Sequence, residues 1–287
     1  MFIEKYFYKT ATEKIGKSLI IPELSRNKYM TKEYIRLFKD QLTDVNIVGS
    51  CAFLYAAGPA SHHNDIRDIK GIDGPKGSAV IKGQVGFTVY TVANMYDNIE
   101  HVSINANTCA SSMYCLHEAR WLLEQYDNVI VYAEDMVDDT EMLLFKQLGI
   151  DLVCSDGIAM MHLTRSRTDN SIAEIPHTAW GWNKDTSPMG VSKEGYNKVL
   201  DKFNLSDINL VKPHGTGTFR NDQEEDLVIS QRFPNAKIVK YKPEIGHTQG
   251  ASALIELCML LDREDNFTAI CIASGLGAHY GAIKVIK

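Results

Sequence analysis

The chain has 287 residues and a mass of 32.1 kDa, with 45% hydrophobic and 23% charged residues. This composition is typical of a soluble globular protein and excludes a disordered or fibrous chain. The sequence contains no run of about eighteen apolar residues, which excludes a transmembrane helix of the usual kind. The net charge of −6 argues against a general nucleic-acid-binding protein, because neutralising phosphates requires a concentrated basic surface.

A cytoplasmic location is expected from two further features. The first residues carry charges at Glu4, Lys5 and Lys9, so they lack the apolar segment of a secretory signal. The chain also has six cysteines and no CxxC pair, a pattern that indicates reduced thiols in the cytosol and leaves room for one reactive member.

The first hundred residues give few structural signals. Helical spacing is present around Tyr34–Leu42, and an apolar segment at 46–57 indicates a strand that enters a turn. Glycines and charges at 60–85 indicate loops. A helix and then a strand at 101–105 follow, and from there the pattern of predicted elements becomes regular.

From residue 101 onward, strands alternate with helices, which predicts βαβ units with helices on both faces of the sheets. The first series contains a strand at 101–105, a helix at 110–125, a strand at 128–135, a helix at 141–148 and a strand at 157–163. The second contains strands at 172–175, 210–213, 237–241, 268–273 and 282–286, with helices at 193–203, 223–233 and 251–261.

Two similar series in one chain indicate a duplicated α/β core, with the chemistry where loops of the two halves meet. No linker separates independent domains, so we predict a single domain over residues 1–287. Its parts are a divergent segment at 1–99, the rest of the N-terminal half at 100–168 and a C-terminal half at 169–287.

Cys109 is the candidate nucleophile. It lies in the segment NTCASS between a predicted strand and a long helix. At the first turn of a helix, unpaired backbone N–H groups and the positive end of the helix dipole favour a thiolate. The alternative interpretation is a small buried hydrophobic residue.

Two histidines follow predicted strands of the second half. His214 lies in KPHGTGT and His247 in KPEIGHT, and glycines beside them let the backbone turn tightly. Either alone would be interpreted as a structural histidine, but two such histidines in one half indicate a shared cleft.

These segments, together with GLGA at 275–278, resemble the β-ketoacyl synthases of the thiolase superfamily, in the branch that uses a cysteine and two histidines. The resemblance covers residues 100–287 and implies a compact variant with a shortened N-terminal region. It also implies a thiolase-like layered fold of two related α/β halves, whose mixed sheets pack on a central helical layer.

The resemblance implies catalytic roles for four residues. Cys109 would take an acyl group from a thioester carrier, and the neutral imidazoles of His214 and His247 would stabilise an enolate through Nε2–H donors. Lys242 would oppose protonation of both imidazoles. The oxyanion hole would use backbone N–H groups of Cys109 and of the turn at 275–278.

Further residues are assigned to binding and support by the same resemblance. Thr216 and Thr218 would donate hydrogen bonds to the pantetheine amides, whereas Asp222 and Glu225 would hold the loop that carries the first histidine. A metal site at these two carboxylates is disfavoured, because such residues at a helix start are more often caps. A ligand role for His62, His63 and Asp65 is disfavoured in the same way, since a solvated loop explains them.

The chain departs from the family where the acyl chain would bind. Leu276 occupies the place of a gating phenylalanine next to Gly277, and His279 replaces a small or polar residue. We predict that these three residues contribute to the acyl pocket, with His279 in its wall or as an extra acid or base.

The implied reaction is a decarboxylative Claisen condensation of an acyl thioester with a malonyl thioester. The alternatives are acyl transfer to an amine or hydroxyl, and a non-catalytic subunit that sets chain length in a partner synthase. The expected partners are acyl carrier protein or coenzyme A thioesters and a second synthase subunit, identical or related, in a dimer. No cofactor is expected, because the substrate brings its own phosphopantetheine arm.

Overall fold

The computed structural model describes residues 1–25, 29–58, 84–137, 139–147, 149–188 and 190–287. Its main feature is a ten-stranded mixed sheet with the order β10-β9-β11-β12-β8-β1-β7-β6-β4-β5. The N-terminal half supplies β1 (Phe2–Thr10), β4 (Cys51–Ala56), β5 (Ile99–Asn105), β6 (Asn128–Asp135) and β7 (Gly157–Thr164). The C-terminal half supplies β8 (Ala173–Trp182), β9 (Leu210–Lys212), β10 (Lys237–Ile238), β11 (Thr268–Gly275) and β12 (His279–Ile286).

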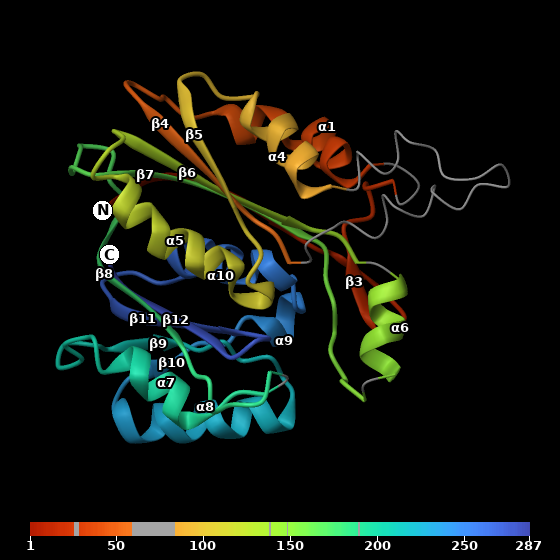
Figure 1. Ribbon diagram of the computed structural model, residues 1–287, viewed down its shortest axis with the longest axis vertical. Helices are drawn as coiled ribbons and strands as arrows, with labels where there is room; N and C mark the ends of the chain where they lie inside the picture. Colours follow the sequence, from red (N-terminus) through yellow and green to blue (C-terminus); the bar gives the residue numbers. More distant parts are fainter. Residues whose placement is uncertain (26–28, 59–83, 138, 148, 189) are drawn as a thin grey trace, which may run out of the picture.

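The two halves have the same topology. In the N-terminal half, β4 is parallel to β5 and β6, and β7 is antiparallel to β6 and β1. In the C-terminal half, β9 is parallel to β10 and β11, and β12 is antiparallel to β11 and β8. They join where β1 and β8 pair at Phe2 and Ile3. Away from that seam they form two layers that face one another (Figure 1). The predicted duplication is therefore confirmed.

Helices fill the space between these layers and cover their outer faces. The central pair is α5 (Ser111–Leu122) and α10 (Ser252–Arg263), which Figure 1 shows between the two halves of the sheet. The outer helices are α1 (Met30–Thr43) and α4 (Val85–Ala93) on the N-terminal half, and α7 (Lys193–Leu200) and α8 (Phe219–Arg232) on the C-terminal half. The remaining elements are α6 (Asp139–Gln147), the short α9 (Lys242–Ile245) and the hairpin of β2 (Glu13–Ile15) and β3 (Ser18–Ile20).

Burial follows this layering. The largest apolar cluster lies around α5 and α10, and a smaller cluster lies under each outer helical layer. Every residue of α10 from Ser252 to Leu261 is buried, as expected for a helix enclosed on all sides. Glu256 is the charged residue within that buried run. Among the residues that the structure describes, no helix combines the length and apolar character needed to cross a bilayer.

The two central helices begin with the same backbone turn. A 3-10 turn precedes each one, η2 (Thr108–Ala110) before α5 and η3 (Gln249–Ala251) before α10. The first residue of each turn is a non-glycine residue with positive φ, 52° at Thr108 and 44° at Gln249. Such residues are uncommon and concentrate at functional sites. The repeat therefore extends to the loop that carries the candidate nucleophile.

The predicted elements agree with the structure in most of the chain, and the predicted layering of two related α/β halves around central helices is confirmed. The prediction missed β1, which lies at the seam of the sheet, because its charged residues and mostly half-buried pattern hide the usual alternation. Strand β10 has two residues instead of the five expected, and β8 is longer than predicted. The expected loops at 60–85 lie almost entirely outside the described residues.

Candidate active site

Cys109 lies in η2, between the end of β5 and the start of α5. Five of the six cysteines of the chain are buried, whereas Cys109 is partly exposed. The first N–H groups of α5 lack partners within the helix, so the positive end of the helix dipole faces this position. The accessible thiol of the chain therefore stands where a thiolate is electrostatically favoured.

Gly275, the last residue of β11, brings the C-terminal half against this turn. A Cβ atom on Gly275 would lie 2.6 Å from the carbonyl oxygen of Asn107 and 2.7 Å from Oγ1 of Thr108. Only glycine tolerates this approach, because the closest atom belongs to the backbone. The turn that follows β11 is thereby held beside Cys109.

His214 follows β9 and is fixed through its backbone. Its N–H donates to Glu225 Oε1 at 2.7 Å, and the N–H of Gly215 donates to Glu225 Oε2 at 2.8 Å. Lys242 Nζ donates to the carbonyl oxygen of His214. Three side-chain contacts thus hold the main chain on both sides of this buried imidazole.

The hydrogen bonds of His247 define its tautomer. The backbone N–H of Gln249 donates to Nδ1 at 3.0 Å, and the hydroxyl of Ser252 also lies 3.0 Å from Nδ1. Because Nδ1 accepts, the ring proton of the neutral imidazole resides on Nε2. This Nε2 atom is buried and has no hydrogen-bond partner among the described residues. The ring is therefore a donor without an acceptor, which is the tautomer that the resemblance implies.

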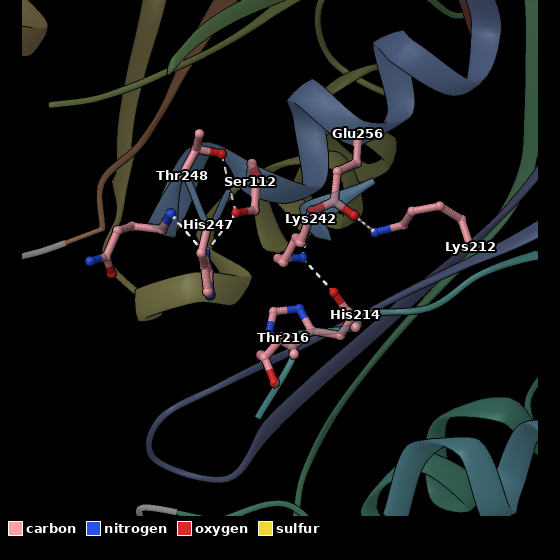
Figure 2. A network of polar contacts seen from close by, with 12 residues as sticks. Ser112, Lys212, His214, Thr216, Lys242, His247, Thr248 and Glu256 are labelled. Carbon is pink, nitrogen blue, oxygen red and sulfur yellow. Dashed lines mark hydrogen bonds and ion pairs between the residues drawn. The ribbon is translucent and has the colours of Figure 1, made fainter. Parts of the chain in front are cut away.

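The two imidazoles lie next to each other. Their ring centroids are 5.7 Å apart and the rings are nearly perpendicular (Figure 2). Burial lowers the pKa of both His214 and His247 well below the usual value, and the nearby ammonium of Lys242 lowers it further. Both rings are thus neutral around pH 7. The turn η3 that follows His247 packs against η2, so the segments carrying the thiol and the imidazoles meet.

Lys242 is part of a buried ion cluster that the sequence did not reveal. Its Nζ contacts Glu256 Oε1 at 2.5 Å, while Lys212 Nζ contacts Glu256 Oε2 at 2.8 Å (Figure 2). All three side chains are at least 97% buried. The signals available in the sequence were a single glutamate in the apolar run of α10 and a lysine at the end of β9.

The threonines of the HGTGT loop bond within the loop itself. The hydroxyls of Thr216 and Thr218 lie 2.8 Å apart, and Thr216 donates to Asp222 Oδ1 at 3.1 Å. The N–H of Gly217 also lies 3.2 Å from Asp222. Asp222 and Glu225 therefore hold the loop of the first histidine, whereas the role of the threonines in binding pantetheine stays a prediction.

The turn after β11 contains the three residues predicted to line an acyl pocket. Leu276 is partly exposed, and the imidazole of His279 stacks on Trp180 with 5.7 Å between the ring centroids. Gly277 has φ of 87°, and its N–H donates to the carbonyl oxygen of Pro188 at 2.7 Å. This N–H is therefore engaged elsewhere and is not the expected oxyanion donor.

Within the described part of the chain, no three histidine, cysteine, aspartate or glutamate side chains are grouped to hold a metal ion. His62, His63 and Asp65 lie outside the described residues.

Two comparisons with known proteins give matches over parts of the sequence. Residues 182–262 match the family described as Beta-ketoacyl synthase, C-terminal domain. The non-reducing polyketide synthase Preu3 of Preussia isomera is 26% identical over 206 residues, which are 64% of this chain but 7% of that protein. The chain thus spans a small part of its curated relative.

Solved structures resemble the chain along nearly its whole length. The complex of the ketosynthase ApeO with its chain length factor ApeC from Xenorhabdus doucetiae matches with a TM-score of 0.78 and 15% identity, over 99% of this chain and 97% of that chain. The fold is that of a β-ketoacyl synthase. A second match to this fold is AntDE:AntF, a ketosynthase in complex with a type II PKS acyl-carrier protein. Its TM-score is 0.76 at 16% identity, over 94% of this chain and 88% of that chain.

Proposed function

We propose that the protein is a condensing enzyme that joins an acyl thioester to a malonyl-type thioester with loss of carbon dioxide. The observation that carries this proposal is the pair of buried, neutral imidazoles, one of which presents an unpartnered Nε2–H in the segment whose turn η3 packs against the turn η2 of Cys109. Two neighbouring imidazoles that both donated to a bound thioester would suit the oxygen of an enolate, where negative charge develops in the reaction.

In the first step, the Cys109 thiolate attacks the acyl thioester, an S–C bond forms and the carrier thiol leaves. The malonyl thioester then binds with its carbonyl oxygen at His214 and His247. Cleavage of its carboxylate bond releases carbon dioxide and leaves the electron pair in an enolate. The enolate carbon attacks the acyl carbonyl on Cys109, and the thiolate is expelled as the β-ketoacyl thioester forms. Neither a redox nor an organic cofactor is required.

The acyl group would be stabilised by backbone donors during both attacks. The N–H of Cys109 at the start of α5 and that of Leu276 in the turn after β11 are the proposed oxyanion donors. Gly275 supports this assignment, since its lack of a side chain holds that turn against η2.

A second subunit is proposed to complete the assembly. Strand β5 lies at one end of the sheet, and Val102 and Ile104 on it are 46% and 43% exposed. An exposed apolar edge strand is a template for pairing, which a two-fold related copy or a related synthase would satisfy. The matched solved structures include complexes with a chain length factor and with an acyl-carrier protein, and we propose both kinds of partner here. The cytoplasmic location stays a prediction.

Intact mass spectrometry and carbon dioxide release test the reaction. The protein incubated with acyl carrier thioesters of different chain length should gain one acyl group, and addition of malonyl thioester should release carbon dioxide. Cys109→Ala should lose acylation entirely. His247→Ala should still acylate but lose decarboxylation by about 10²–10³-fold.

Two results would redirect the assignment. Acylation without decarboxylation would indicate acyl transfer to another acceptor. Absence of acylation with every carrier would indicate a non-catalytic subunit, although the presence of Cys109 and both imidazoles argues against that role.

A further inference from the structure

The two halves of the fold give an internal comparison for the buried ion cluster. Val131 and Cys271 occupy the same position in β6 and β11, four residues before the last residue of each strand. Leu54 pairs with Val131, and Lys212 pairs with Cys271. Lys212 therefore stands in the C-terminal half where the N-terminal half has a buried leucine.

The partner of Lys212 follows the same rule. Cys115 and Glu256 each lie four residues after the first residue of their central helix, α5 or α10. Leu54 and Cys115 are both fully buried in the central apolar cluster. The fold thus accommodates apolar side chains at both positions. Burying charges instead costs free energy, since each ion loses its hydration.

We infer that Lys212 is a positioning residue of the active site, because it shares the carboxylate of Glu256 with Lys242. This shared contact fixes Lys242 on the main chain of His214. The ammonium group of Lys212 also adds positive charge beside both imidazoles. Each oxygen of Glu256 receives one ammonium group. With its second oxygen occupied by Lys212, Glu256 presents the first oxygen to Lys242 in a single orientation. Lys242 in turn donates to the carbonyl oxygen of His214.

The charged groups around the two rings come from four elements. Lys212 lies on β9, Lys242 on α9, Glu256 on α10 and Glu225 on α8. Two ammonium groups share one carboxylate, and burial raises the pKa of the other carboxyl, Glu225, to about 7. The surroundings of the rings therefore carry no fixed excess of negative charge, which would favour imidazolium.

The inference rests on the proposed function, because an enolate requires neutral N–H donors and a protonated ring would release its proton to the product. Lys212 contributes through space to the lowered pKa of both His214 and His247, after burial and Lys242. Its removal should therefore favour the protonated rings.

The test replaces Lys212 by leucine, the residue at the equivalent position of the other half, and by arginine, which keeps the charge. Carbon-13-labelled histidine lets nuclear magnetic resonance follow the titration of His247, assigned by its loss in His247→Gln. In Lys212→Leu the pKa of His247 should rise by about one unit, as a unit charge removed from a poorly solvated site predicts. Lys212→Arg should restore the original titration.

Activity gives a second, separate readout. In the pH profile of the rate of carbon dioxide release, the acidic limb should move to higher pH in Lys212→Leu, while acylation of Cys109 stays unchanged. An unchanged titration of His247 in folded Lys212→Leu would overturn the inference. So would failure of that variant to fold, because Lys212 would then serve the fold itself. The titration needs no turnover, so a wild-type protein that releases no carbon dioxide would contradict the proposed function alone.

Discussion

The two halves of the molecule begin their central helices with one backbone turn but with different residues. Cys109 is the second residue of η2, and Gly250 is the second residue of η3. A Cβ atom on Gly250 would lie 2.4 Å from the backbone nitrogen of Gly58, whereas Cys109 has room for a partly exposed thiol. The same turn therefore occurs twice in the fold, and only one copy presents a thiol, that of the candidate nucleophile Cys109.

The C-terminal half contributes a different set of groups. It carries both imidazoles and the buried ion cluster, in which Lys212 and Glu256 stand where the N-terminal half has the buried apolar side chains of Leu54 and Cys115. At these two positions the C-terminal half therefore bears the cost of burying charge, and the N-terminal half does not. The predictions below test that division.

Glu256→Gln should cause the largest loss of stability. It leaves two buried ammonium groups without their carboxylate, which should lower the free energy of unfolding by about 3–5 kcal/mol. Denaturant titration measures this change. The same substitution at Glu244, which pairs with Arg263 on the surface, is the matched control and should cost less than about 1 kcal/mol. Equal losses in the two variants would refute the distinction.

Gly250→Ala should lower the free energy of unfolding by about 3 kcal/mol, because the added methyl group meets backbone atoms that cannot rotate away. The reciprocal variant, Cys109→Gly, removes a partly exposed side chain and should leave the melting temperature nearly unchanged while abolishing acylation. Calorimetry of both proteins compares the two turns. An unchanged melting temperature of Gly250→Ala would contradict the difference in packing between the two turns.

The pH dependence of the free energy of unfolding should reveal the lowered pKa values of the two buried imidazoles. The pKa of His214 and His247 in the folded protein lies below the value of about 6.5 expected in the unfolded chain. Between these values the unfolded chain binds more protons, so the free energy of unfolding falls as the pH drops below about 6.5. Each histidine contributes up to about 1.4 kcal/mol per pH unit in that window. The free energy of unfolding, measured by urea titration at several pH values, should fall less steeply with decreasing pH in His247→Gln than in the wild type.

Much of the fold could be predicted because most strands and helices carry strong local signals. The apolar run of β6 fixes its limits, Asn128–Asp135, as the structure has them. Strand β1 could not be found this way, because it owes its place to pairing with β7 and β8, which follow it in the chain by 147 residues or more (Thr10 pairs with Gly157). Its own residues show no clear alternation.

The candidate site also contains residues that local sequence motifs predict and residues that only the folded structure brings together. Cys109, His214 and His247 stand in short motifs, so the sequence identifies them. Lys212 and Glu256 lie 44 residues apart and meet only through the packing of β9 beneath α10. A pair of this kind becomes visible when the chain has folded, since a lone glutamate in an apolar run and a lysine at a strand end do not indicate that the two residues meet.

The open edge of β5 has a consequence for how the chain is made. Among the described residues β5 ends the sheet, and its exposed valine and isoleucine suit the strand of the proposed partner but also any other extended peptide. If the proposed partner exists, synthesis alongside it should raise the yield of intact protein, and an excess of the single chain should precipitate. The stoichiometry of expression, more than the sequence of the loops around Cys109 and the two histidines, would then govern how much intact protein a cell accumulates.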